Sequence, residues 1–171
     1  MNEPVILLLG MMGAGKTSVG TAIAQVTGWT YLDNDELVEQ ATGRTPPAIL
    51  GADGEDALRA AETDALRRAL QLRPPAVAGV AGGAVLGPAN RDLLRAAPDV
   101  VWLRARPDTL IRRVGRGAGR AWLQPDPATA ITRLTAIREP YYAEVADAIV
   151  DVDDLSPEEA AAAVLAVVAT R

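Results

Sequence analysis

The sequence predicts an α/β fold in which a mainly parallel, five-stranded sheet lies between two layers of helices, a three-layer α/β/α arrangement. Short, continuously apolar segments alternate with amphipathic segments of helical length along the whole chain. Connections of this kind form right-handed βαβ units. We see no internal repeat and no linker long enough to separate domains, so we expect one domain over residues 1–171.

The expected strands are short and bounded by glycine, proline or acidic residues. They cover residues 5–9, 29–33, 76–80, 100–103 and 148–152. Helices are expected at 16–27, 36–43, 56–72, 90–97, 107–114, 127–145 and 157–169. Residues 45–54 form a broken, partly helical connector, and Ser156 is the expected N-cap of the last helix. Residues 115–127 are rich in glycine, arginine and proline and are too long for an ordinary turn, so we expect a flap there.

Composition excludes several classes of function. The 171-residue chain has no cysteine and no histidine, which rules out thiolate metal sites and the most common general base. A net charge of −5 argues against a nucleic-acid partner. No apolar run approaches the roughly 20 residues that span a bilayer, and no secretory signal is recognisable. We expect a monomeric cytoplasmic protein that binds neither membranes nor nucleic acids.

A glycine-rich loop between the first expected strand and helix reads Gly10-x-x-x-x-Gly15-Lys16-Thr17. Its glycines let consecutive backbone N–H groups face phosphate oxygens, and the helix that follows adds its N-terminal dipole. Lys16, the only lysine in the chain, would bridge the terminal phosphates, and the Thr17 hydroxyl would bind Mg²⁺. The alternative is a glycine turn without chemistry. The loop residues expected to hold ATP are Gly13, Ala14, Gly15, Lys16, Thr17 and Ser18.

Two carboxylates follow the second expected strand, in the sequence Asp33-Asn34-Asp35. Ligands of open α/β sheets bind beyond the carboxyl ends of the strands, so both lie on the side of the glycine loop. Residues i and i+2 of an extended chain share a face. One carboxylate is then available to hold Mg²⁺ through water, and the other to accept a proton from a substrate hydroxyl. Alternatively, both acidic residues belong to the cap of the next helix.

Further candidates lie after the third strand and on three arginine-bearing segments. Gly82 and Gly83 allow the backbone to approach a ligand closely, although a plain turn has the same composition. Arg59 is expected on the first turn of a helix, where a cation opposes the dipole, so either a ligand compensates it or it is a solvated surface residue. Arg120 lies on the flap, and Arg138 begins the sequence REPYY.

In order and spacing, these motifs resemble the shikimate kinase family over essentially the whole chain. The matching segments are GMMGAGKTSVG, YLDNDELVEQATG, DGEDALRAAE, GGAV, the arginine flap and REPYYAEVADAIVDVDDLSPEE. The resemblance implies a P-loop kinase fold with strand order 2-3-1-4-5 and a lid at about residues 115–127. It implies ATP and Mg²⁺ as cofactors and shikimate as the acceptor, which is phosphorylated to shikimate 3-phosphate.

The resemblance also implies roles at the phosphoryl-transfer centre. Asp35 would contact the acceptor hydroxyls and act as the base, while Asp33 would support Mg²⁺. Arg120 would reach from the lid to the transferring phosphate and to the substrate. A stabilising cation at that point is useful because water is excluded there. Arg112 would lie near the adenine ring, together with Lys16 among the nucleotide-binding residues.

For the acceptor, the resemblance implies that Arg59 and Arg138 bind its carboxylate, with Gly82 and Gly83 nearby. Two arginines suit one carboxylate because the guanidinium group forms paired hydrogen bonds to it. The expected acceptor is therefore a small, anionic, polyhydroxylated molecule.

The acceptor region departs from the family pattern. The family usually has three glycines after the third strand, whereas this chain has Ala81 before Gly82. The chain has no phenylalanine, and leucines stand at the two expected phenylalanine positions, Leu50 and Leu58. The lid reads Arg120-Ala-Trp122-Leu in place of the usual Arg-Pro-Leu-Leu. A related kinase for another polyol, cyclitol or sugar acid is thus an alternative, as are a nucleoside monophosphate kinase and a nucleotide-binding regulatory protein.

Overall fold

The computed structural model describes residues 3–115 and 126–170. Five parallel strands form a sheet in the order β2-β3-β1-β4-β5, which confirms the predicted topology. Leu8 at the centre of the sheet is paired with Gly79 of β3 on one side and Val101 of β4 on the other. The strands are β1 Val5–Leu9, β2 Thr30–Leu32, β3 Ala76–Gly79, β4 Val100–Arg104 and β5 Ala148–Asp151.

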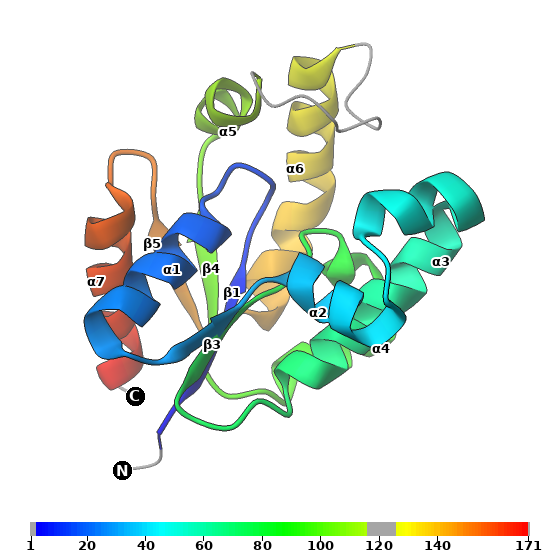
Figure 1. Ribbon diagram of the computed structural model, residues 1–171. Coiled ribbons are helices and arrows are strands. Elements are labelled where there is room, and N and C mark those ends of the chain that lie inside the picture. Colours follow the sequence, from blue (N-terminus) through cyan, green and yellow to red (C-terminus); the bar gives the residue numbers. More distant parts are fainter. Residues whose placement is uncertain (1–2, 116–125, 171) are drawn as a thin grey trace.

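Helices cover both faces of the sheet, as Figure 1 shows. α1 (Lys16–Thr27) and α7 (Pro157–Ala169) lie on one face, and α3 (Pro46–Ala69), α4 (Pro88–Arg95) and α6 (Pro127–Val145) lie on the other. α2 (Asn34–Thr42) packs against α3, and α5 (Pro107–Val114) follows β4. Within the described part of the chain, no helix has the length and hydrophobicity required to cross a membrane.

The core explains why the central strands are continuously apolar. Ile6, Leu7, Leu8 and Leu9 are each 0% exposed, because a strand covered by helices on both faces has no solvent side. On the face of α6, the rings of Trp102 and Tyr142 meet with their centroids 5.6 Å apart. This contact brings α6 close to the sheet, and α6 carries one of the candidate substrate residues.

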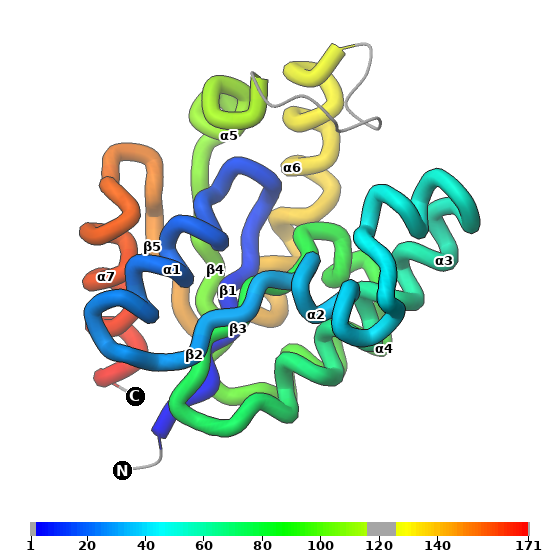
Figure 2. The backbone as a smooth tube through the Cα atoms, in the orientation of Figure 1, coloured from blue at the N-terminus to red at the C-terminus, as the bar shows by residue number. Residues whose placement is uncertain are grey.

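The segment 45–54, expected as a broken connector, is the first part of α3. Thr45 occupies the N-cap position and prolines follow at the first helical positions, where a missing N–H is tolerated. Gly54, with φ 85° and ψ −177°, leaves the helical conformation and gives the chain a new helix start at Glu55. Figure 2 shows this break, and it also shows α2 beside the first part of α3. A short 3₁₀ helix at Ala84–Leu86 (η1) was not expected.

The predicted N-cap of α7 is present. The Ser156 hydroxyl accepts the Glu159 N–H at 3.1 Å, and the Glu159 carboxylate accepts the Ser156 N–H at 2.8 Å. These two bonds satisfy donors that the helix itself leaves unpaired. The backbone N–H of Ser156 also lowers the pKa of Glu159. Helix α7 therefore begins at a fixed point, directly after the segment that closes one end of the cleft described next.

Candidate active site

A cleft of about 1140 Å³ opens where the parallel strands end. Its walls come from the glycine loop after β1, the start of α2, the first part of α3, the loop after β3, and α6. The segment between β5 and α7 closes one end together with the start of α7, and Val152, Leu155 and Pro157 are among the lining residues. The cleft lies at the edge of the sheet where ligands of open α/β sheets bind. It is large enough for more than one small ligand.

The glycine loop has the backbone of a phosphate cradle. Gly13 (φ 82°) and Gly15 (φ 97°) adopt left-handed conformations that other residues rarely take, and Gly15 is the N-cap of α1. A Cβ atom on Gly13 would also lie 2.6 Å from a methyl carbon of Val114. The first N–H groups of α1 have no partner within the helix, so they are available to an anion. All of the loop residues from Gly13 to Ser18 line the cleft.

The Lys16 ammonium group lies over the start of the same loop. Its Nζ donates to the carbonyl oxygen of Gly10 at 2.7 Å and to that of Met11 at 3.1 Å. The side chain also lines the cleft. A compact ammonium group at this point, held by two carbonyl dipoles, can stabilise negative charge on phosphate oxygens that lie in the loop.

Thr17 and Asp33 bring two oxygen ligands together between α1 and the end of β2. The Thr17 hydroxyl donates a short hydrogen bond to Asp33 Oδ2, and that oxygen also accepts the Tyr31 hydroxyl at 3.2 Å. Burial, reinforced by the nearby Asp33 charge, raises the pKa of Tyr31, so the phenol remains a donor. Hydroxyl and carboxylate oxygens are the ligands that Mg²⁺ prefers, with water and phosphate completing its shell. The residues present therefore fit a magnesium ion beside the loop.

Asp35 also lines the cleft, but it reaches the cleft from a helix and not from an extended chain as expected. The prediction that Asp33 and Asp35 share the face of a strand is wrong, because β2 ends at Leu32 and α2 begins at Asn34. Asp33 is the N-cap, its N–H donating to the Glu36 carboxylate at 3.0 Å, and Asp35 lies in the first turn. The helical turn still directs both carboxylates to the cleft. The Asn34 amide donates to Asp35 Oδ1 at 3.3 Å.

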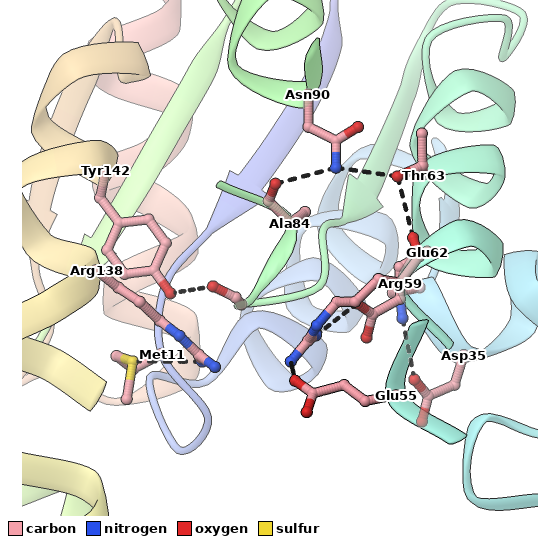
Figure 3. A network of polar contacts seen from close by, with 12 residues as sticks. Met11, Asp35, Glu55, Arg59, Glu62, Thr63, Ala84, Asn90, Arg138 and Tyr142 are labelled. Carbon is pink, nitrogen blue, oxygen red and sulfur yellow. Dashed lines mark hydrogen bonds and ion pairs between the residues drawn. The ribbon is translucent and has the colours of Figure 1, made fainter. Parts of the chain in front are cut away.

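The two glycines after β3 lie next to two arginines, and Gly83 makes room for one of them. A Cβ atom on Gly83 would lie 2.4 Å from Nη1 of Arg59, and one on Gly82 would lie 3.5 Å from Nη1 of Arg138. Arg59 reaches the loop from α3 and Arg138 from α6, and Figure 3 shows their guanidinium groups pointing toward each other. All four residues line the cleft. The structure thus brings together the two arginines expected to bind an acceptor carboxylate and the two glycines expected near them.

Arg59 is held by two carboxylates of its own helix. Its Nη1 donates to Glu62 at 2.7 Å and its Nη2 to Glu55 at 3.1 Å. Burial acts to lower the pKa of Arg59, but these carboxylates outweigh burial and hold it above its ordinary value. Burial raises the pKa of Glu62, while the Arg59 and Arg138 charges oppose that rise. The guanidinium group of Arg59 is therefore permanently charged and fixed in direction.

Arg138 is more deeply buried, with only 5% of its surface exposed. Its Nη1 contacts the sulfur of Met11 at 3.8 Å, and its Nε has no hydrogen-bond partner among the described residues. A buried guanidinium group with incomplete hydrogen bonding is unfavourable unless an anion approaches it. Arg138 therefore favours a negatively charged group at this end of the cleft.

Three residues at which the sequence departs from the family pattern, Ala81, Leu50 and Leu58, also line the cleft. Ala81 and Leu58 are 8% and 3% exposed, so both are packed into the protein rather than projecting into solvent. The acceptor end of the cleft is thus formed partly by small and aliphatic side chains. Aliphatic walls of this kind discriminate between ligands of different size by only about 1–3 kcal/mol per methylene.

Comparison with known proteins identifies the chain. The family model described as "Shikimate kinase" matches residues 12–169. The chain belongs to the shikimate kinase family. It is 42% identical to a shikimate kinase of Moorella thermoacetica over 86% of this chain and 84% of the relative. It is 39% identical to that of Salinispora arenicola over 97% and 98% of the two chains. The structure of a shikimate kinase from Acinetobacter baumannii in complex with shikimate superposes with a TM-score of 0.91, at 33% identity over 99% of this chain and 94% of the other.

Arg113 and Glu62 are among the cleft residues of this shikimate kinase family member that were not selected from its sequence. Arg113 lines the cleft and donates to the carbonyl of Val152 at 2.8 Å, whereas Arg112, expected near adenine, is not among the lining residues and contacts Thr109. Neighbouring helical residues point about 100° apart, so choosing between them required the helix orientation. Glu62 lies three residues after Arg59, and this i, i+3 spacing on a helix was the sequence signal that could have identified it.

Two expected residues fall outside the described part of the chain. Arg120, expected to reach the transferring phosphate, and Trp122 lie within residues 116–125. The same holds for most of the lid expected at 115–127, of which Gly115, Asp126 and Pro127 are described at the ends of α5 and α6.

The contact between Gly83 and Arg59 leads to a testable expectation. The variant Gly83→Ala places a methyl group against the Arg59 guanidinium, which has to shift from its position beside the loop. We expect the KM for the acceptor to rise roughly tenfold or more, a loss of about 1.4 kcal/mol, with the KM for ATP within about twofold of the original value. Steady-state kinetics with each substrate varied in turn measures both values.

Gly51→Ala is the matched control for this variant. Gly51 is also on α3, and a Cβ atom there meets nothing within 4 Å. We expect its kinetics to be unchanged. An unaltered acceptor KM in Gly83→Ala would show that the close approach of loop and guanidinium does not matter for binding.

Proposed function

We propose that this protein transfers the γ-phosphoryl group of ATP to a hydroxyl of shikimate, giving shikimate 3-phosphate and ADP. One observation carries the proposal. Arg59 and the buried Arg138 face each other over Gly82 and Gly83 at the acceptor end of a cleft that also contains the phosphate loop. Two guanidinium groups in this arrangement suit the carboxylate of a small acid. The proposed acceptor is the one that the related enzymes' names specify.

On the acceptor side, the arginine pair would bind the carboxylate and orient the ring. Asp35 would accept a hydrogen bond from the reacting hydroxyl and take its proton as that oxygen attacks the γ-phosphorus. The new bond joins the acceptor oxygen to phosphorus, and the bond between phosphorus and the β–γ bridging oxygen breaks to release ADP. The position of Asp35 in the first turn of α2 supports this role, because the same turn begins beside Thr17 and Asp33.

On the donor side, the N–H groups of the glycine loop and the Lys16 ammonium group would hold the β- and γ-phosphates. Thr17 and Asp33 would hold Mg²⁺, which supplies positive charge to the phosphate oxygens when it is bound. Arg113 and the segment from Val152 to Pro157 would form the base end of the nucleotide site. Arg120 keeps the role that the family resemblance implies. All of these residues belong to one chain, so we expect a monomer to be active.

The leading alternative is a kinase of the same family fold for another anionic polyol. Ala81, Leu50 and Leu58 favour it, because they line the acceptor end and replace the residues usual in the family. A nucleoside monophosphate kinase would require a second base-binding surface, which these residues do not provide. A regulatory protein that only binds nucleotide would have no use for an arginine pair facing Asp35 across the cleft.

A coupled ADP-release assay with a panel of acceptors tests the proposal. Shikimate is the expected substrate, and shikimate methyl ester, with the same ring and no negative charge, is its matched control. We expect the ester to lose roughly 10²-fold in kcat/KM, since it leaves a buried guanidinium without an anionic partner. Turnover of a cyclitol or sugar acid with none of shikimate would favour the alternative kinase. ADP release that is independent of every acceptor would contradict the kinase function.

A further inference from the structure

The loop that follows β3, here called the acceptor loop, accepts hydrogen bonds from side chains of other elements. The Tyr142 hydroxyl of α6 donates to the carbonyl oxygen of Gly82 at 2.6 Å, and the Asn90 amide of α4 donates to that of Ala84 at 3.0 Å. Burial raises the pKa of Tyr142 to about 12, so its hydroxyl remains a donor at neutral pH. Figure 3 shows both bonds on the side of the loop away from Asp35. The carbonyl groups of this loop are thus occupied by the protein.

Asn90 makes a second hydrogen bond that leads to the opposite wall of the cleft. The same Nδ2 atom donates to the Thr63 hydroxyl at 3.1 Å, and Thr63 in turn donates to the carbonyl oxygen of Arg59 at 3.0 Å. Figure 3 shows the Asn90 amide between Ala84 and Thr63. A continuous chain of hydrogen bonds therefore joins the backbone of the acceptor loop to the backbone of the residue that bears the Arg59 guanidinium.

The length of this series of hydrogen bonds matters because the acceptor loop and the Arg59 guanidinium group are already in contact. The position of a Cβ atom on Gly83 is 2.4 Å from Arg59 Nη1 and 2.8 Å from its Cζ. Any change in the separation of α3 from the loop moves the guanidinium relative to the loop backbone. Charged hydrogen bonds weaken steeply with misalignment, so a small shift of this kind weakens the grip on a carboxylate.

Asn90 lies where it can set the separation of α3 from the acceptor loop without touching the ligand. It is 6% exposed and does not line the cleft, and neither does Thr63. A buried amide that spans two structural elements fixes their distance more narrowly than an apolar contact would, because hydrogen-bond geometry is directional.

We propose that Asn90, acting through Thr63, is a positioning residue for the acceptor: it sets the Arg59 guanidinium against the Gly82–Gly83 loop. The proposal rests on the proposed function, since it assigns Asn90 to the acceptor half of that site. Among the described residues, Asn90 donates hydrogen bonds to Ala84 and Thr63 and to no residue of the phosphate loop. Loss of either hydrogen bond should therefore affect the acceptor and leave ATP unaffected.

The experiment compares three substitutions that preserve side-chain size as far as possible. Asn90→Leu removes both donors, Thr63→Val removes the hydroxyl alone, and Thr63→Ser restores it. We expect the acceptor KM for shikimate to rise about five- to twentyfold in Asn90→Leu and Thr63→Val and to return to within about twofold in Thr63→Ser, with the ATP KM unchanged throughout.

Thr27→Val is the matched control, because the Thr27 hydroxyl makes a comparable pair of hydrogen bonds elsewhere. Its hydroxyl donates to the Ile23 carbonyl, four residues back in α1, and accepts the Trp29 N–H. Thr27 does not line the cleft. We expect this variant to lose thermal stability to a similar degree as Thr63→Val and to keep both KM values. Equal changes in the acceptor KM of Thr27→Val and Thr63→Val would overturn the proposal, as would equal rises in the two KM values of Asn90→Leu.

A second measurement needs no acceptor, so it judges the inference even if shikimate proves not to be the substrate. Hydrogen exchange of residues 80–87 should become faster in Asn90→Leu than in the original protein, while exchange in the glycine loop stays the same. Unchanged exchange of residues 80–87 would show that Asn90 does not hold the loop. Failure of the original protein to phosphorylate shikimate, with faster exchange in the variant, would contradict the proposed function and leave the positioning role intact.

Discussion

Replacing Lys16 with methionine is expected to reduce phosphoryl transfer by about 10²- to 10³-fold or more, the loss typical when one charge-stabilising donor is removed from an active site. Methionine has a similar length and no charge. The Lys16 ammonium group lies at the carbonyls of Gly10 and Met11 and lines the cleft beside the phosphate cradle. Transfer is measured by coupled ADP release at saturating ATP and acceptor, and nucleotide affinity by calorimetry with MgADP.

Two controls separate the charge of Lys16 from its contribution to folding. The hydrogen bonds to Gly10 and Met11 are lost in the variant, and such bonds from a charged group contribute about 1.5–3 kcal/mol each at most, so denaturant unfolding should show a folded protein. Lys16→Arg keeps the charge but replaces a compact ammonium group with a broad planar one, and we expect it to be impaired as well. Near-normal transfer by folded Lys16→Met would refute the phosphate cradle.

The variant Asp35→Asn is expected to lower kcat by about 10²- to 10⁴-fold, the usual contribution of a positioned general base. The amide has almost the same shape as the carboxylate, but it cannot take the proton of the attacking hydroxyl. Because Asp35 lies on α2 and not in the glycine loop, the KM for ATP should change little. The measurement is steady-state kinetics with shikimate as acceptor, together with ADP release in its absence.

Glu36→Gln is the control for Asp35→Asn. Glu36 lies in the same turn, and its carboxylate accepts the Asp33 N–H at 3.0 Å without lining the cleft. We expect a loss of stability of about 1 kcal/mol, as for a weakened helix cap, and a normal kcat. If Asp35→Asn and Glu36→Gln had the same small effect on kcat, Asp35 would have no role in the chemistry.

The parts of the fold that follow from local rules were predictable from the sequence. The glycine loop is one example, since its geometry depends on residues adjacent in the chain and on the helix that follows directly. The buried central strands are another, because their continuous hydrophobicity reflects helices on both faces. The N-cap Ser156 is also local, and it was found at the expected position, where Glu159 completes the cap.

The features that could not be predicted depend on where elements meet. Asp33 and Asp35 were expected to share a face of an extended chain, but α2 begins at Asn34, two residues earlier than expected, which changed the direction of each side chain. The choice between Arg112 and Arg113 depends on how α5 is rotated against the glycine loop. Asn90 gives no signal in the sequence, because its partners Ala84 and Thr63 come from two other elements. Such residues become visible only when the three-dimensional arrangement is known.

The crowding around Gly82 and Gly83 also limits which positions can be varied when a new acceptor is sought by directed evolution. A Cβ atom on Gly82 would lie 3.0 Å from the Gly10 carbonyl oxygen and one on Gly83 would displace the Arg59 guanidinium, so diversity introduced there would mostly yield clones with weakened acceptor binding. Positions 50, 58 and 81 already carry side chains other than those usual in the family, and they line the same end of the cleft. A mutant library confined to these three positions would search new acceptor shapes while leaving the nucleotide half of the enzyme untouched.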